Sequence, residues 1–167
     1  LVKNTLDTDN QIQSACNSFV DAKGSMFLGR GSSFPIALEG ALKLKELAYI
    51  HAEGYPAGEM KHGPLALIED GMPVVVIAPR DYYYNKTISN MQEVIARGAK
   101  VLLITNKSTD EIFSENIWQK IEVENTDDDL LPFLITIPLQ KLAYHSALKK
   151  GYDIDKPRNL AKSVTVE

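Results

Sequence analysis

The run Val-Val-Val-Ile-Ala at residues 74–78 constrains the fold more than any other stretch of the chain. Its apolar residues do not alternate with polar ones, which indicates a strand covered on both faces, as in a parallel sheet. Three other short apolar runs predict further buried strands: Ser25–Leu28, Val101–Thr105 and Trp118–Val123. Helical patterns separate these runs, over residues 9–22, 35–50, 83–97 and 130–150. Strands that alternate with helices predict a doubly wound α/β fold, for which we expect about five mostly parallel strands.

Turn and capping residues give this prediction its finer detail. Asp9 is the expected N-cap of the first helix, and Pro138 predicts a kink in the last one. Residues 51–64 show neither a helical nor a strand period and are expected to be a loop, and residues 110–116 allow a short helix. Ligands in doubly wound folds bind beyond the carboxyl ends of the strands. The turn at residues 29–33 and the loop at 51–64 are therefore expected at that edge.

Length and charge exclude several classes of function. The 167 residues suggest one domain, and a net charge of −4 without a basic patch argues against nucleic-acid binding. No apolar run reaches the length of a membrane span, so we expect no membrane contact. The single cysteine, Cys16, excludes an internal disulfide and a cysteine-based metal site, and it suits the reducing cytoplasm. A start without methionine is expected for a piece of a longer chain or for a processed chain.

The helix over residues 35–50 carries an unusual arrangement of charge. At about 100° per residue, Glu39, Lys43 and Glu46 fall within roughly 60° of one another, and apolar residues occupy most of the remaining circumference. Two interpretations stay open. The stripe is either a solvated edge with i,i+4 support, or a set of paired charges facing a wet cavity.

The three histidines differ in what surrounds them. His145 lies in the long final helix, where a packing role is expected. His62 lies in the tight turn Lys61-His62-Gly63-Pro64, and with Glu46 it would make the acid–base pair that aldose–ketose chemistry needs. The chain has no complete dinucleotide fingerprint, no Walker A motif and no repeated metal-ligand spacing, so we expect neither a cofactor nor a metal.

Five segments together resemble one enzyme family. They are residues 27–31 (FLGRG), 37–46 (ALEGALKLKE), 49–53 (YIHAE), 58–64 (GEMKHGP) and 157–167 (PRNLAKSVTVE). The chain is similar to the glucosamine-6-phosphate synthase family, whose members are glutamine:fructose-6-phosphate amidotransferases. The resemblance covers essentially the whole chain and is to the C-terminal sugar isomerase (SIS) domain, the second of two. It implies the three-layer SIS fold.

The resemblance also implies roles for individual residues. Glu46 matches the glutamate that moves a proton between C1 and C2 of the sugar, and Lys43 matches the lysine that supports the developing charge. His62 matches a histidine that assists ring opening and comes from the neighbouring subunit. Lys162 matches the tail lysine that meets the open-chain sugar carbonyl, and Ala161 matches a backbone contact to the sugar.

The same resemblance implies a domain layout and partners. Residues 1–151 would form the SIS domain and residues 152–167 an active-site tail. Fructose 6-phosphate and glucosamine 6-phosphate would be the ligands. The implied partners are a glutaminase domain, a first SIS domain that supplies the phosphate-binding loop, and a second copy in a homodimer. The alternative is a non-catalytic SIS module that binds a phosphosugar to regulate a partner, and a proton-transfer base argues against it.

Composition and resemblance disagree about the tail. Residues 153–167 have no helical period, which is typical of a loose end. The resemblance instead leads us to expect an ordered tail that packs over the carboxyl edge of the strands. In this prediction Leu160 is one of the apolar anchors, and Lys162 points into the cavity beside Glu46 or its counterpart in the dimer.

Overall fold

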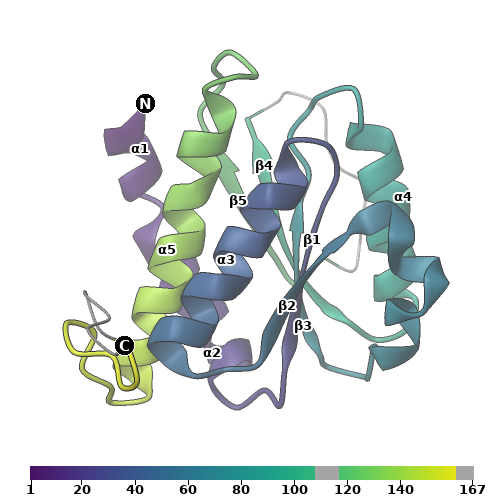
Figure 1. The fold of residues 1–167 in the computed structure, drawn as a ribbon. Coiled ribbons are helices and arrows are strands. Elements are labelled where there is room, and N and C mark those ends of the chain that lie inside the picture. The colour runs from purple at the N-terminus through teal and green to yellow at the C-terminus, as the bar shows by residue number, and fades with distance from the viewer. Residues whose placement is uncertain (108–116, 161–167) are drawn as a thin grey trace, which may run out of the picture.

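The computed structural model describes residues 1–107 and 117–160. A five-stranded sheet of order β2-β1-β3-β4-β5 forms its centre, and every neighbouring pair of strands is parallel. The strands are β1 (Ser25–Gly29), β2 (Ala52–Pro56), β3 (Pro73–Ile77), β4 (Lys100–Asn106) and β5 (Gln119–Val123). This arrangement confirms the predicted doubly wound α/β fold, with five parallel strands (Figure 1).

Helices cover the sheet on both faces. One layer holds α1 (Val2–Leu6), α2 (Asp9–Val20), α3 (Ser33–Ala48) and α5 (Leu131–Lys149). The opposite layer holds α4 (Tyr84–Ile95) and two 3₁₀ turns, η1 (Ala57–His62) and η2 (Pro64–Leu67) (Figure 1). In the described ranges no helix combines the length and apolarity needed to cross a membrane.

Two separate apolar cores explain the absence of alternation in the central strands. Val75 and Ile77 of β3 belong to the core under α3 and α5, whereas Val74 and Val76 belong to the core under α4. All five residues of β3 are buried. A strand buried on both faces has no position for a polar residue, so the run at residues 74–78 reads as continuously apolar.

The prediction of a loop over residues 51–64 is wrong for its first half. Residues 52–56 form β2, an edge strand that pairs with β1 alone. Gly54 allows α3 to lie close against this strand, because an ideal Cβ there would be 2.9 Å from Leu38 Cδ2 and 3.0 Å from Leu38 Cα. The predicted loop is thereby divided. His51 lies at the amino edge of the sheet, whereas η1 follows the carboxyl end of β2 and packs on the α4 side of the sheet.

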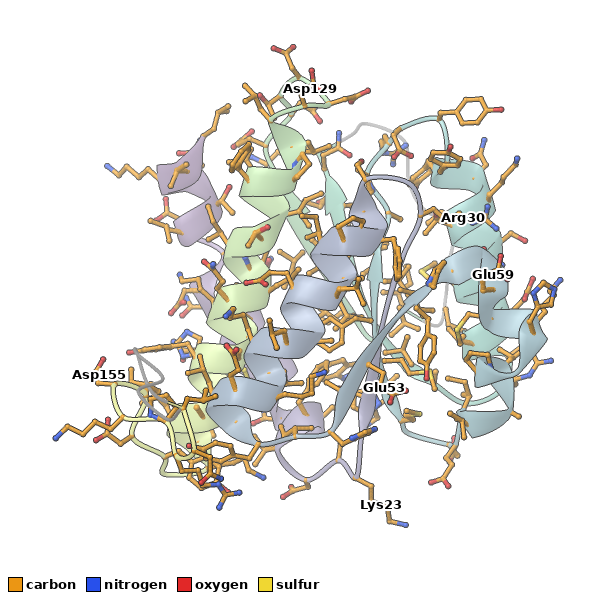
Figure 2. The ribbon with its side chains drawn as sticks, viewed as in Figure 1. Lys23, Arg30, Glu53, Glu59, Asp129 and Asp155 are labelled. Carbon is orange, nitrogen blue, oxygen red and sulfur yellow. The ribbon has the colours of Figure 1, made fainter. Side chains whose placement is uncertain are left out.

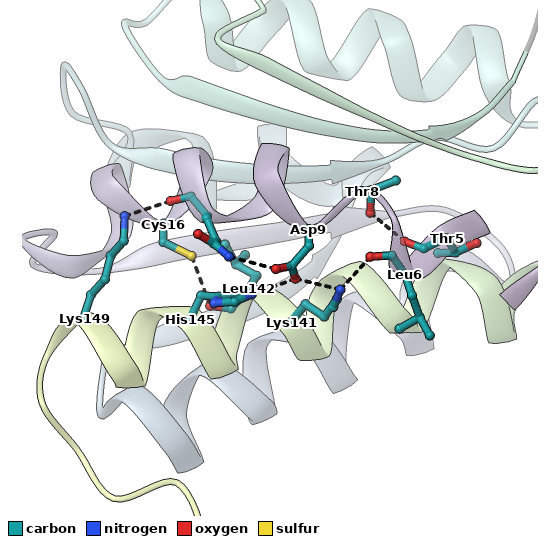
Figure 3. A network of polar contacts seen from close by, with 10 residues as sticks. Thr5, Leu6, Thr8, Asp9, Cys16, Lys141, Leu142, His145 and Lys149 are labelled. Carbon is teal, nitrogen blue, oxygen red and sulfur yellow. Dashed lines mark hydrogen bonds and ion pairs between the residues drawn. The ribbon is translucent and has the colours of Figure 1, made fainter. Parts of the chain in front are cut away.

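Asp9 also differs from its predicted role. The helix begins at Asp9, with Thr8 as an N-cap that makes no side-chain capping bond. Asp9 instead forms an ion pair with Lys141 at 2.6 Å and a contact with His145 at 2.8 Å, which joins α2 to α5 (Figure 3). The helix α5 is continuous through Pro138. The predicted short helix at 110–116 lies outside the described residues.

Candidate active site

The charged stripe predicted on α3 lies on the side of that helix away from the sheet. Lys43 Nζ is 2.6 Å from Glu46 Oε2 and 3.7 Å from Glu39 Oε1. The three side chains are about one-third exposed, so the pairs are neither buried nor fully solvated. The hydrogen bond to Glu46 is the main cause that raises the pKa of Lys43, with partial burial acting against it. The arrangement is a carboxylate held beside a permanent cation.

Such a pair suits proton transfer at a carbon next to a carbonyl. Glu46 can accept or return a proton, and Lys43 is close enough to stabilise negative charge that develops beside it. Within the described residues, no cluster of three histidine, cysteine, aspartate or glutamate side chains is arranged to hold a metal ion. The Lys43–Glu46 pair offers acid–base groups.

His62 lies at the end of η1, on the opposite layer from Glu46. Its Nδ1 is 2.7 Å from Glu59 Oε2, and the exposed fractions of the two side chains are 73% and 61%. Because η1 packs against α4 whereas Glu46 is on α3, one chain does not bring the two candidate acid–base residues together. The partner of His62 in this structure is Glu59, a residue that the sequence analysis did not single out.

The described part of the tail packs against the end of α3. The backbone N–H of Arg158 donates to the hydroxyl of Tyr49 at 2.7 Å, and the Arg158 guanidinium lies 4.1 Å from the centre of the same ring. Tyr152 also contacts Tyr49, with ring centroids 4.8 Å apart. Tyr49 follows the last turn of α3, which carries Glu46. The described part of the tail thus lies against the residue that follows the turn of α3 carrying Glu46.

Two details of the tail prediction are wrong. The tail follows α5, which ends at the amino edge of the sheet, so the described residues lie at that edge and not at the carboxyl edge (Figure 1). Leu160 is half exposed, whereas Tyr152 and Ile154 pack against the core and supply the apolar anchors. Ala161 and Lys162 lie outside the described residues.

The crevice at the carboxyl ends of β1 and β3 has the wrong charge for a phosphate. It encloses about 210 Å³ and is lined in part by Ser32, Ser33, Asp81 and Asp128. Burial, the larger cause, raises the pKa of Asp81, and the charge of Asp128 adds to it. Two carboxylates disfavour an anionic ligand. A larger cavity of about 540 Å³ lies at the amino edge, where its lining includes His51 rather than Glu46 or His62.

Two other titratable side chains, Cys16 and His145, make contacts that are typical of structural residues. Cys16 is buried, which raises the pKa of its thiol, and its Sγ lies 3.6 Å from the carbonyl oxygen of Leu142. Cys16 belongs to the apolar core under α3 and α5. His145 contacts Asp9 at the junction of α2 and α5, as a packing residue would (Figure 3).

Comparison with known proteins gives a consistent result. The family model described as SIS domain matches residues 18–150. Glutamine–fructose-6-phosphate aminotransferase [isomerizing] of Bartonella henselae is 52% identical over 167 residues, and its namesake in Aquifex aeolicus is also 52% identical. In both cases the match covers 100% of this chain and 28% of the relative. The chain therefore spans little more than a quarter of the length of these relatives.

A solved structure agrees with this match. The C-terminal domain of glucosamine-fructose-6-phosphate aminotransferase from Francisella tularensis has a TM-score of 0.89 and 47% identity to the chain. The alignment covers 93% of this chain and 44% of that one. The fold described above therefore corresponds to less than half of that C-terminal domain.

Proposed function

The chain belongs to the SIS domain family, and from this membership we propose that it supplies acid–base residues for sugar isomerisation in a longer glutamine–fructose-6-phosphate aminotransferase. The Lys43–Glu46 pair is the observation that carries the proposal. In this role Glu46 moves a proton between C1 and C2 of the open-chain sugar, and Lys43 stabilises the negative charge that develops meanwhile. The product is glucosamine 6-phosphate, made from fructose 6-phosphate and glutamine-derived ammonia.

Residues from outside a single SIS domain would complete this site. We assign ring opening to His62 of a neighbouring subunit in a homodimer, because Glu46 and His62 lie on opposite layers of one chain. Lys162 would meet the sugar carbonyl and Ala161 would contact the sugar through its backbone. The contact of Arg158 with Tyr49 supports this, since Tyr49 follows the turn of α3 that carries Glu46.

The outer surface of the α3–α5 layer supports docking of another SIS domain of the same parent chain. Large apolar side chains are exposed on these two helices at Leu38, Leu42, Phe133, Tyr144 and Leu148. A helix that is apolar around most of its circumference is usually covered. The longer chain of the solved C-terminal domain has room for a second unit of this size. We propose that the first SIS domain covers this surface and supplies the phosphate grip.

The acidic crevice at β1 and β3 bears on the alternative function, a regulatory module that binds a phosphosugar by itself. Such a module needs cationic or N–H groups around the phosphate. The crevice in this chain includes Ser32 and Ser33 at the start of α3, but it also presents the carboxylates of Asp81 and Asp128. This observation favours the catalytic role over the regulatory one.

Replacement of Glu46 by glutamine in the full-length protein tests the proposal. We expect formation of glucosamine 6-phosphate to fall about 10²–10⁴-fold, the usual contribution of a positioned acid–base group. Glutamine hydrolysis should continue, because its nucleophile would belong to another domain. Glu39→Gln is the matched control, since Glu39 also pairs with Lys43 but at the longer distance of 3.7 Å. A parent rate of sugar conversion in Glu46→Gln would refute the assignment.

A further inference from the structure

The turn after β1 holds the backbone around Arg30 in one conformation. A Cβ on Gly29 would lie less than 3.0 Å from the backbone of Ser33, and one on Gly31 would lie 2.7 Å from the ring of Tyr83. Gly31 also has a φ of 54°, which favours glycine. The backbone N–H of Ser33 donates to the carbonyl oxygen of Arg30 at 3.0 Å and closes the turn. These constraints fix the backbone on both sides of Arg30.

The Arg30 side chain joins three elements. Its Nε donates to Oδ1 of Asn90 at 3.1 Å, and Asn90 is a residue of α4 that is only 8% exposed. Its guanidinium lies directly against Gly58 of η1, where an added Cβ would be less than 3.0 Å from Nη2. The end of β1, the helix α4 and the turn η1 therefore meet on one planar group, on the side of the sheet where Figure 2 shows Arg30 and Glu59.

The rest of η1 is held from the same side. Met60 is fully buried in the core under α4, and Lys61 forms an ion pair with Glu93 of α4 at 3.0 Å. Glu59 and His62 are the members of the turn that point outward and pair with each other. The backbone of η1 is thus anchored on one side, and its histidine is presented on the other.

We propose that Arg30 is a positioning residue for His62, acting through the contact of its guanidinium with Gly58. The proposal rests on the proposed function, which gives His62 a role at a neighbouring sugar. The planar guanidinium determines how closely η1 approaches α4, and it therefore determines the position of the His62 side chain. Glu59, bound at Nδ1 of that histidine, leaves Nε2 to face the sugar. A side chain at position 58 would force either η1 or the Arg30 guanidinium to shift, and either shift would break this contact.

A double-mutant cycle in the full-length protein tests the contact itself. Gly58→Ala and Arg30→Ala should each slow glucosamine 6-phosphate formation about ten- to a hundredfold, the scale expected for a small misplacement of a catalytic group. The double variant should be no slower than Arg30→Ala, because the atom that a Cβ would strike is gone. Arg97→Ala is the matched control, since Arg97 is exposed and its Nη1 bonds to the backbone oxygen of Glu93. If Arg30→Ala does not fold, Arg30→Lys takes its place, because lysine keeps the positive charge but lacks the planar guanidinium.

A second cycle asks whether Arg30 acts through His62. In a His62→Gln background, Arg30→Ala should cause no further loss of sugar conversion, and glutamine hydrolysis should stay at the parent rate in every variant. Peptides covering residues 57–62 should exchange amide hydrogens faster in Arg30→Ala. Equal losses in both backgrounds, or a Gly58→Ala variant with parent activity, would overturn the positioning role. Parent activity in His62→Gln alone would overturn the proposed function of His62 and this inference with it, and that single variant separates the two failures.

Discussion

The contacts of His145 and His62 distinguish a structural histidine from a candidate catalytic one. His145 is mostly buried between two helices and contacts Asp9, which Lys141 also binds. His62 is paired as closely, with Glu59, but stands in solvent at the end of a well-anchored turn. An exposed ion pair contributes little to stability. The His62–Glu59 pair therefore adds little to the stability of the fold, although the turn that carries it is well anchored. This combination makes the pair a better candidate for a functional role than for a structural one.

The Asp9 pair predicts how stability depends on pH. The hydrogen bond from Lys141 is the main cause that lowers the pKa of Asp9 far below its usual range, and the contact with His145 adds to it. A carboxylate whose pKa is lowered by folding stabilises the fold above its unfolded pKa of about 4, and this contribution is lost as the pH falls below that value. Asp9→Asn should therefore reduce the free energy of unfolding at pH 7 by about 1 kcal/mol, the scale of a partly exposed pair.

Urea denaturation of the parent and the variant at pH 7 and at acid pH measures this effect. The difference between the two proteins should shrink as the pH is lowered, because the parent carboxylate becomes protonated. Asp7→Asn is the control, since Asp7 is exposed two residues earlier. A stability difference that stays constant between neutral and acid pH would argue against the ion pair as its cause.

At the scale of elements, strands buried on both faces could be predicted and the edge strand could not. The β3 run is continuously apolar because helices cover both of its faces. The edge strand β2 has the sequence Ala-Glu-Gly-Tyr-Pro, in which glycine and proline are both disfavoured in strands. What makes it a strand is its pairing with β1 and its contact with α3, neither of which has a local signal. Tertiary packing here overrides local propensity.

The same distinction applies to the candidate site. The stripe on α3 could be predicted because helical periodicity places Glu39, Lys43 and Glu46 on one side. The link from Arg30 to Gly58 and Asn90 could not, because it joins residues 28 and 60 positions apart through their tertiary arrangement alone. Periodicity reports the neighbours of a residue on its own helix and carries no information about contacts between elements.

Gly54 gives a prediction at the scale of the α3–β2 contact. Gly54→Ala should destabilise the fold by about 1–3 kcal/mol, because the new methyl group would strike the backbone and side chain of Leu38. Thermal unfolding followed by circular dichroism measures the loss. Gly24→Ala is the matched control, since the nearest atom to a Cβ there is 3.4 Å away, an ordinary contact. If both variants melted at the same temperature, close approach of α3 to β2 would not be the reason for glycine at position 54.

At the scale of the whole molecule, one chain carries two candidate acid–base residues that do not meet. Glu46 lies on the α3–α5 layer and His62 on the α4 layer. The sheet and its two cores separate these layers (Figure 1). No small rearrangement of side chains brings residues together across a packed sheet. If both act on one sugar, they must come from different copies of the chain.

Mixing two impaired variants of the full-length protein tests this arrangement. We expect Glu46→Gln and His62→Gln each to keep only a small residual rate of sugar conversion, about 10²–10⁴-fold below the parent rate. In a mixed dimer, one site would receive both substitutions and the other would receive neither, because each site takes Glu46 from one subunit and His62 from the other. Random reassociation of equal amounts makes half of the dimers mixed, so conversion should recover to about a quarter of the parent rate. If each site instead took both residues from its own chain, every site in the mixture would carry one substitution and no activity would return.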